Sequence, residues 1–484
     1  MIARLLHLGP GEWRKVGALW AVGVAYAAAT TLGENVAQSI FAGRVGAGQL
    51  ARMFLVKGAF DVLASALYLP LTRGRDPARV LRVALVAYAA TIVAGRLAVL
   101  GSGALPAYAL YIGHECAWTV LTIHWGVYVL DVFDAAEARR LFPLIFTAAR
   151  VGGIAGGAAL RALAAPVGAA NLLWAGAGLA ILGAVLARGG THPPAPADAD
   201  EPEADRLRAA PLDRLRATLR ASWSSPLVRA IALSTATMVF LRYGLRILSL
   251  GSIQIHFAGD EDRVAAFLGA YISWANAAAI ALGLLVTPRL LARAGVGAAN
   301  VAYAAATTVA YGVLLLFPSL GAAVTARFVD TELKDALKTP LSALFYGAER
   351  PDRRAEARAF VFGAVIPAAT TLTFVAYELG PRALGLRGLV WLGFAAALLF
   401  VGLSVQQNRA WRRRLRALLA WKLERAPTPP AAALPPELAP HAGDEAVALA
   451  WRGLASDDAR TRAVAQEVLA EAIPRALARR VASR

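Results

Sequence analysis

Apolar stretches, each near the length of a bilayer-spanning helix, follow one another from the N-terminus to about Gln406. Hydrophobic residues make up 58% of the 484 residues, more than a single soluble core of this size can enclose. A helix needs roughly 20 apolar residues to cross the hydrocarbon layer of a bilayer. The sequence therefore predicts an all-α membrane protein with about twelve spans. We place them at residues 14–41, 47–70, 78–100, 105–131, 142–163, 168–188, 227–250, 264–287, 297–317, 319–347, 357–379 and 386–406.

Two short fragments recur at equivalent places in the first six and the last six spans. Residues 86–90 and 301–305 both read VAYAA, and residues 136–139 and 355–358 both read AEAR. The recurrence favours a duplicated architecture of two six-helix halves, as parallel repeats about the membrane normal produce. We divide the chain into an N-terminal bundle, a cytoplasmic linker, a C-terminal bundle, an amphipathic interfacial helix and a small helical tail. Their predicted limits are 12–188, 189–226, 227–406, 407–425 and 441–484.

The chain carries 50 Lys and Arg residues against 32 Asp and Glu residues, a formal net charge of +18. In a soluble protein such an excess would indicate a nucleic-acid partner. Here the arginines gather in alternate loops and in the C-terminal segment, which is the positive-inside pattern. We therefore expect membrane lipids and no nucleic acid as partners, in a multi-pass bacterial inner-membrane protein with both termini in the cytoplasm.

The polar segments outside the spans differ in character. The first part of the linker, 191–205, is rich in Pro and acidic residues and is expected to be disordered, whereas 211–223 reads as a basic amphipathic helix on the membrane surface. Residues 409–425 suit an interfacial helix on anionic lipid, and a Pro-rich hinge follows at 427–440. The tail reads as two short helices that resemble one HEAT-type repeat, with Ser456 or Asp457 as a cap. One repeat cannot bury its own apolar face, so we expect the tail to pack on the cytoplasmic side or on a partner protein.

Charges within the first four spans are candidates for function, because each costs about 2.5–3.5 kcal/mol at the centre of a bilayer. Lys57 and Asp61 lie four residues apart in the second span. They either neutralise each other, or Lys57 binds an anionic substrate while Asp61 orients it. Glu34 in the first span and Glu115 in the fourth are candidates for coupling or for counter-charge. The alternative for Glu115 is an ion pair with Arg96 or Arg150.

Arginines in the fifth and seventh spans could bind an anion directly. Arg150 precedes the glycine run 152–157, whose two overlapping G-x-x-x-G spacings predict close helix packing and allow a sliding surface. Arg242 and Arg246 lie one turn apart on one face of the seventh span. Two guanidinium groups that project together suit a phosphate or a carboxylate. The alternative is contact with lipid headgroups.

The tenth span is unusually polar for a membrane helix. Arg327, Asp330, Lys334 and Lys338 fall near one face by α-helical spacing, whereas Glu332 and Asp335 point elsewhere. A segment this polar does not face lipid, so we predict that it lines a water-filled cavity or is a broken helix. Either Lys334 and Lys338 meet an anionic substrate there, or the charges form salt bridges between the halves.

Motifs of enzyme catalysis and of cofactor binding are missing from the sequence. It contains no Walker A sequence, no HExxH and no GxSxG. The histidines do not have the spacing of a zinc site. We therefore predict a protein that is not an enzyme and that needs no metal or cofactor.

Part of the chain resembles the major facilitator superfamily and, within it, the nucleotide transporter (ADP/ATP carrier) branch. The resemblance rests on residues 115–125, 131–133, 137–145 and 152–157 and on the charged tenth span. It implies alternating access around a cavity that binds an anionic metabolite such as ATP or ADP. It also implies that an acid of the fourth span and a lysine of the tenth act in transport, which are Glu115 and Lys334 or Lys338 here. The family's acid in the eighth span is replaced by Asn276.

We predict a secondary active transporter for a phosphorylated or nucleotide-like anion. A proton-coupled exporter or lipid translocator is the first alternative, and a non-transporting membrane scaffold or sensor is the second. The candidate substrate-binding residues are Lys57, Arg150, Arg242, Arg246, Lys334 and Lys338, and the candidate coupling or counter-charge residues are Glu34, Asp61, Glu115 and Asp330.

Overall fold

The computed structural model describes residues 12–72, 75–132, 135–187, 223–425, 434–441 and 443–482, and within these ranges it is almost entirely helical and has no β-strand. The side chains of residues 61–71 and 130–144, with a few single positions elsewhere, are not described. The predicted linker and its surface helix, up to residue 222, and residues 426–433 of the predicted hinge lie outside the described residues.

The first half contains six helices whose positions follow the first six predicted spans. Two of its connections pass through a glycine with positive φ, Gly46 at 99° and Gly168 at 88°, each followed by a short 3-10 turn. The helices are α2 (Glu12–Arg44), α3 (Leu50–Thr72), α4 (Pro77–Ala98), α5 (Ala104–Val132), α6 (Ala135–Val167) and α7 (Leu172–Leu186).

The second half also follows the predicted spans, but several of them are continuous or contain π-helical segments. The seventh span is α10 (Pro226–His256). The eighth and ninth comprise α11 (Glu261–Ala281), η3 (Leu282–Val286) and α12 (Thr287–Leu316). The tenth comprises α13 (Leu320–Phe328), η4 (Val329–Lys338) and α14 (Thr339–Gly347), and the last two comprise α15 (Pro351–Phe360), η5 (Val361–Val365) and α16 (Ile366–Leu423).

Two glycines separate spans that are otherwise joined without a loop. Gly295 in α12 has φ 88° and Gly385 in α16 has φ 67°, a left-handed conformation that a residue with a Cβ rarely adopts. Six described segments are long and apolar enough to cross a membrane, and the two longest, Glu261–Leu316 and Glu356–Leu423, each contain one of these breaks. The predicted fold class, an all-α membrane protein built of two six-helix halves with a helical extension, is confirmed.

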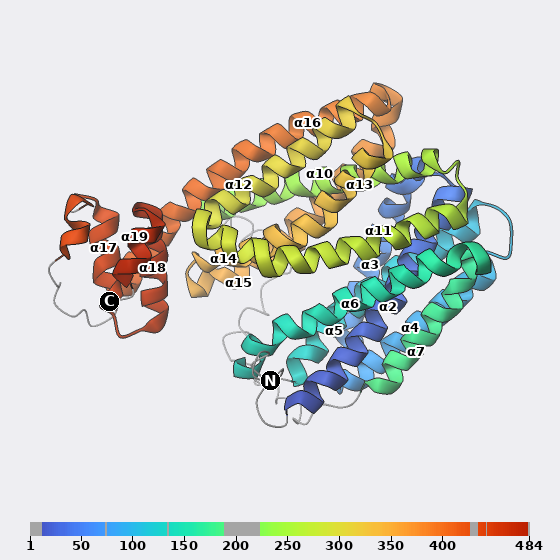
Figure 1. The fold of residues 1–484 in the computed structure, drawn as a ribbon, viewed down its shortest axis with the longest axis horizontal. Helices are drawn as coiled ribbons and strands as arrows, with labels where there is room; N and C mark the ends of the chain where they lie inside the picture. The colour runs from blue at the N-terminus through green and yellow to red at the C-terminus, as the bar shows by residue number, and fades with distance from the viewer. Residues whose placement is uncertain are drawn as a thin grey trace.

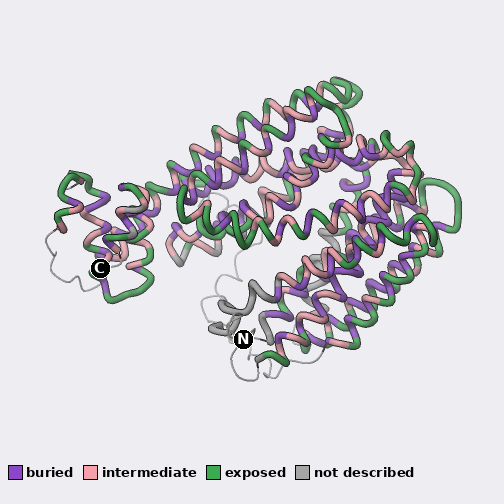
Figure 2. Tube along the Cα trace, in the orientation of Figure 1, coloured by how far each residue is buried: buried purple, intermediate pink, exposed green. Residues whose placement is uncertain are grey.

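The two halves meet at one end of the molecule and diverge toward the other, where the N-terminus lies (Figure 1). Across the interface α6 packs along α11, α2 also touches α11, and α3 touches α16. We call the end with the connections 44–50, 98–104, 167–172 and 256–261 the closed end, and the opposite one the terminal end. Figure 2 shows buried residues inside each bundle and exposed ones on the outer faces. Apolar side chains such as Val185, 73% exposed, and Leu372, 69% exposed, lie on these outer faces, as lipid contact requires.

The predicted interfacial helix is instead a continuation of α16. Its apolar residues Trp411, Leu415 and Leu419 are buried in a cluster that the second half and the tail share. Trp411 packs on Phe345 of α14, whereas Leu419 lies against Gly453 of the tail. The tail has three helices where two were predicted, because Pro474 ends the second and starts another turn. These helices are α17 (Glu445–Leu454), α18 (Ala459–Ala472) and α19 (Arg475–Ala482).

Asp458 caps α18, in place of the predicted Ser456 or Asp457. Its carboxylate accepts hydrogen bonds from the backbone N–H groups of Arg460 and Thr461, both at 3.0 Å, and from the Thr461 hydroxyl at 2.6 Å. The Thr461 hydroxyl, followed by the Arg460 amide, holds the pKa of the Asp458 carboxyl well below its usual value. The second helix of the tail therefore begins one or two residues later than the two predicted caps imply.

Candidate functional site

Arg246 of α10 brings the two halves together at membrane depth. Its Nη2 lies 3.0 Å from the Glu34 carboxylate on α2 and 3.2 Å from the Glu115 carboxylate on α5. The Tyr111 hydroxyl lies 3.4 Å from the same nitrogen, and the guanidinium lies 5.1 Å from the centre of the Phe54 ring. Four contacts to three helices of the other half fix this side chain, and its Nη2 is shared between two carboxylates.

Lys57 of α3 shares one of these carboxylates. Its ammonium nitrogen lies 3.9 Å from the second oxygen of Glu115. Glu115 is 5% exposed. Its carboxylate lies near one cation from each half, Lys57 and Arg246. The alternative partners considered for Glu115 were wrong, because Arg96 donates to Asn171 at 2.6 Å and Arg150 pairs elsewhere.

Arg150 of α6 makes the second link between the halves. It donates to the buried Glu332 carboxylate, lies 3.4 Å from Asp335, and donates to the Asn276 amide oxygen at 3.1 Å. Lys334 lies 2.6 Å from the other Asp335 oxygen. Asn276, which stands in the eighth span where the resemblance implies an acid, thus contacts Arg150.

Arg242 and Arg327 complete the group from the second half. Arg242 forms an ion pair with Asp330 at 3.0 Å and donates to the Asp330 backbone carbonyl at 3.1 Å. Arg327 donates to the Gln38 amide oxygen at 2.8 Å, and the Gln38 nitrogen donates to Glu34 at 2.9 Å. The alternative position of Arg242 and Arg246 at lipid headgroups is not observed, since both pair with carboxylates inside the protein.

We call this set of side chains the interhalf network. Among the described residues it holds more cations than carboxylates, and the cationic side chains of Arg150, Arg242, Arg246 and Lys334 remain 21–26% exposed. Partial exposure means that a small solute can reach these groups. Its members are Lys57, Arg150, Arg242, Arg246, Arg327 and Lys334, with Glu34, Glu115, Asp330, Glu332 and Asp335.

The π-helical segment η4 decides which way the charges of the tenth span point. A π-helix has more residues per turn than an α-helix, so the facing of successive residues shifts. Asp330 faces α10, whereas Glu332 and Asp335 face α6 of the other half. The α-helical prediction that Arg327, Asp330, Lys334 and Lys338 share one face was therefore wrong for Lys338.

Lys338 lies inside the second half, away from the interhalf network. It is 3% exposed, its ammonium donates to the Asn300 amide oxygen at 2.7 Å, and Asn300 in turn donates to Asn408 at 3.0 Å. The rings of Phe345 and Phe400 have their centres 5.8 and 5.6 Å from its nitrogen. No described carboxylate lies within 4.0 Å of it. The side chain of Asp61 is not described, so its pairing with Lys57 stays a prediction.

The glycine run of α6 packs on both of its sides. A Cβ on Gly152 or Gly156 would meet the backbone of α2 in the same half, at 2.5 Å from Val24 O and 2.9 Å from Ala28 O. A Cβ on Gly157 would lie 2.7 Å from the Gly269 carbonyl on α11 of the other half. The predicted close packing is present, and one of the two faces lies on the interface between the halves.

The closed end is held by polar contacts between the halves. Arg44 pairs with Glu261 at 2.8 Å, and Arg52 pairs with Glu378 at 2.5 Å. The amide of Ala47 donates to Gln254 at 2.7 Å, and that of Ala169 donates to Asp262 at 2.6 Å. A pathway through the protein is therefore blocked at this end in the observed conformation.

Comparison with known proteins supports the fold and leaves the substrate undetermined. No family model and no curated protein sequence matches the chain. Solved structures do match. A bacterial homologue of the human lysosomal transporter Spinster, inward-facing and unoccupied, has a TM-score of 0.53 at 16% identity, over 84% of this chain and 99% of its own. The nucleoside transporter NupG (D323A mutant) has a TM-score of 0.58 at 14% identity, over 82% and 99%. An auto-inhibited POT family peptide transporter has 0.59 at 11% identity, over 83% and 97%. The fold is thus similar to that of these three transporters.

Proposed function

We propose that the chain is a secondary active transporter that moves a small anionic metabolite, phosphorylated or nucleotide-like, across the bacterial inner membrane by alternating access. The observation that carries this proposal is the interhalf network. Ionisable groups at membrane depth normally serve a pathway. Here cations of both halves converge where the halves must separate and rejoin in each cycle.

The carboxylates of the network keep the cations charged and oriented while no substrate is bound. An entering phosphate takes the place of Glu34 or Asp335 as the partner of an arginine or lysine, so one charge-assisted bond is exchanged for another. That exchange releases a link between the halves and shifts the equilibrium between the two access states. With both termini cytoplasmic, the observed closed end faces outward, and the protein is open to the cytoplasm.

Flux measurements in proteoliposomes test the proposal. Labelled phosphorylated sugars, nucleotides and inorganic phosphate are offered one by one to vesicles that contain the purified full chain. We expect uptake or exchange of at least one of these anions, lost in Arg246→Ala and in Lys334→Ala. The matched control is Arg96→Ala, which removes an arginine that bonds to Asn171 outside the network. Unchanged flux of every transported anion in both network variants would show that the interhalf network is not the substrate-binding site.

A proton-coupled exporter is the second candidate, and the double pairing of Glu115 favours it. Protonation of this one carboxylate would release Arg246 and Lys57 together and so connect a proton to the interface. In Glu115→Gln, an exporter is expected to lose transport driven by a pH gradient while it retains exchange at equal pH. Loss of both activities to the same extent would assign Glu115 to substrate binding instead.

A further inference from the structure

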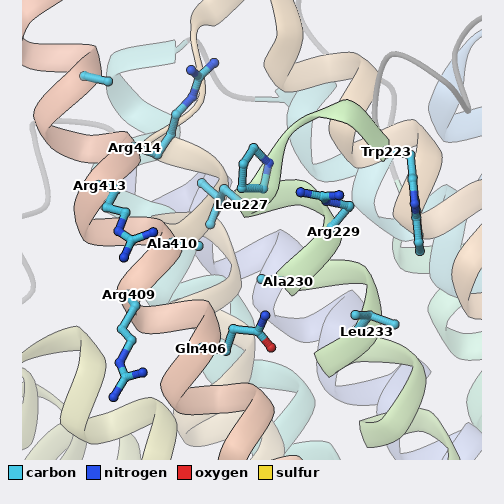
Figure 3. A pocket seen from close by; sticks show the side chains of 12 residues that line it. Trp223, Leu227, Arg229, Ala230, Leu233, Gln406, Arg409, Ala410, Arg413 and Arg414 are labelled. Carbon is cyan, nitrogen blue, oxygen red and sulfur yellow. The ribbon is translucent and has the colours of Figure 1, made fainter.

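A hollow of about 780 Å³ lies between the first turns of α10 and the part of α16 that leaves the bundle at the terminal end (Figure 3). It is separate from the interhalf network and shares no residue with it. Its lining residues are Trp223, Pro226, Leu227, Arg229, Ala230, Leu233, Gln406, Arg409, Ala410, Arg413, Arg414 and Ala417.

Four arginines make this hollow strongly cationic. Arg414 is neutralised by Glu349, at 2.7 Å. Arg229, Arg409 and Arg413 are exposed, and none of them has an ion pair with a side chain that the structure describes. Figure 3 shows Arg229 reaching into the hollow from α10, with Arg413 on α16 across from it. The N-terminus of the 31-residue helix α10 adds the positive end of its dipole.

The remaining walls of the hollow are apolar. Ala230 and Ala410 lie between the two helices, where their small side chains leave the space open. Leu233, 44% exposed, continues the wall one to two turns farther into the membrane-spanning part of α10, and Trp223, 47% exposed, stands at the rim. A tryptophan at the level of the headgroups and an aliphatic wall below it are what the interface of a bilayer requires.

We infer that the hollow binds the headgroup of an anionic phospholipid from the leaflet at the terminal end. The phosphodiester lies between Arg229 and Arg413, since guanidinium groups bind phosphate oxygens in a bidentate manner. The acyl chains run along Leu233 and the exposed outer face of α10. A free phosphate would use the same arginines but would gain nothing from the apolar wall. The inference does not depend on which substrate the network binds.

Thermal stabilisation of the purified full chain in detergent measures this binding, because a ligand of the folded state raises the unfolding temperature by mass action. The probes are dihexanoyl phosphatidylglycerol, dihexanoyl phosphatidylcholine and inorganic phosphate. We expect saturable stabilisation by phosphatidylglycerol and none by phosphatidylcholine. Stabilisation by inorganic phosphate, if it arises at the interhalf network, is expected to be the same in the unmodified chain and in R229Q/R413Q. In the double variant R229Q/R413Q the half-saturating concentration is expected to rise about 25-fold, roughly fivefold for each arginine.

The matched control is R416Q/R460Q, which removes two exposed arginines of the same end that do not line the hollow. It is expected to bind phosphatidylglycerol as the unmodified chain does. Equal weakening in both double variants would show diffuse attraction to a basic surface and would overturn the inference. Stabilisation by inorganic phosphate that is lost in R229Q/R413Q would identify a free-anion site at the hollow, and stabilisation by phosphatidylcholine equal to that by phosphatidylglycerol would identify a site for acyl chains only. Either result would contradict the proposed headgroup site.

Discussion

At the scale of single residues, Arg150 and Arg246 place their charges in ion pairs that cross between the halves. Glu332 is 1% exposed and depends on Arg150 of the other half for its neutralisation. Removing one member of such a pair leaves an uncompensated buried charge, which costs more than the pair itself contributes. The stability of the whole chain therefore depends on ion pairs that a transport cycle must also open.

We predict that Arg150→Ala lowers the free energy of unfolding by about 3 kcal/mol, because Glu332 is left buried without its partner. The double variant R150A/E332Q is expected to recover at least half of that loss, since the neutral amide needs no counter-charge. Thermal unfolding of the unmodified chain, R150A, E332Q and the double variant in one detergent measures this. Additive losses in the double variant would contradict the coupling.

For Lys338 we predict the opposite, that removal of the charge does not destabilise the fold. Its ammonium is buried beside the neutral Asn300, so Lys338→Met removes a charge that is costly to bury while it keeps most of the side-chain volume. We expect the unfolding temperature of K338M to be unchanged or higher. Asn300→Leu, which leaves the ammonium without its acceptor, is expected to lower it by several degrees. A lower unfolding temperature in K338M than in N300L would show that the lysine stabilises the fold.

At the scale of helices, the α6–α11 contact depends on glycine. Gly157 and Gly269 let the two backbones approach so closely that a Cβ on either would meet the carbonyl of the other. Gly156, one position away, faces α2 of its own half. One helix thus presents a face that holds its bundle together and a second face on which the halves separate.

We predict that Gly157→Val opens the closed end, because the added side chain pushes α11 away from α6. The measurement is the labelling rate of a cysteine at Gln254, in a C116S background, with a membrane-impermeant thiol reagent. It is expected to rise several-fold in G157V. Gly156→Val is the control, which is expected to lower the unfolding temperature without raising the labelling rate. Equal labelling rates in the two variants would contradict the inference that one face of α6 packs within its own half and the other controls the contact between the halves.

At the scale of the whole molecule, the tail belongs to the second half. It covers the extension of α16, Lys422 pairs with Asp458 at 3.2 Å and Arg412 pairs with Glu471 at 3.5 Å. Arg475 of α19 also lies against Gly295, where the eighth span turns into the ninth. The tail is therefore placed to move with one half, as a rigid extension of it.

Deletion of residues 426–484 is predicted to lower stability but not the transport rate per folded molecule. The cut uncovers apolar side chains of the α16 extension that pack on the tail, such as Leu419, and they become a patch for aggregation. Size-exclusion profiles in detergent and flux in proteoliposomes separate the two effects. Loss of all function with intact folding would instead favour a scaffold that acts through its tail.

The sequence by itself determined the class of the molecule and the places where chemistry is concentrated. Spans could be located because a bilayer imposes a local requirement, a minimum length of apolar residues, which each segment meets on its own. Charges such as Arg246 and Glu115 stood out because the cost of placing them in hydrocarbon is also local. Most members of the network were therefore identified as candidates without any knowledge of their partners.

Only the tertiary structure decided which charges meet. The rotation of each helix is set by packing against its neighbours, so sequence spacing could not show that Glu115 pairs with Arg246 rather than with Arg150. The π-helical segment changed the facing of Lys338 for the same reason, since it exists only where neighbouring helices stabilise it. The α16 extension, predicted to lie on lipid, was buried by a tail whose position no local pattern encodes.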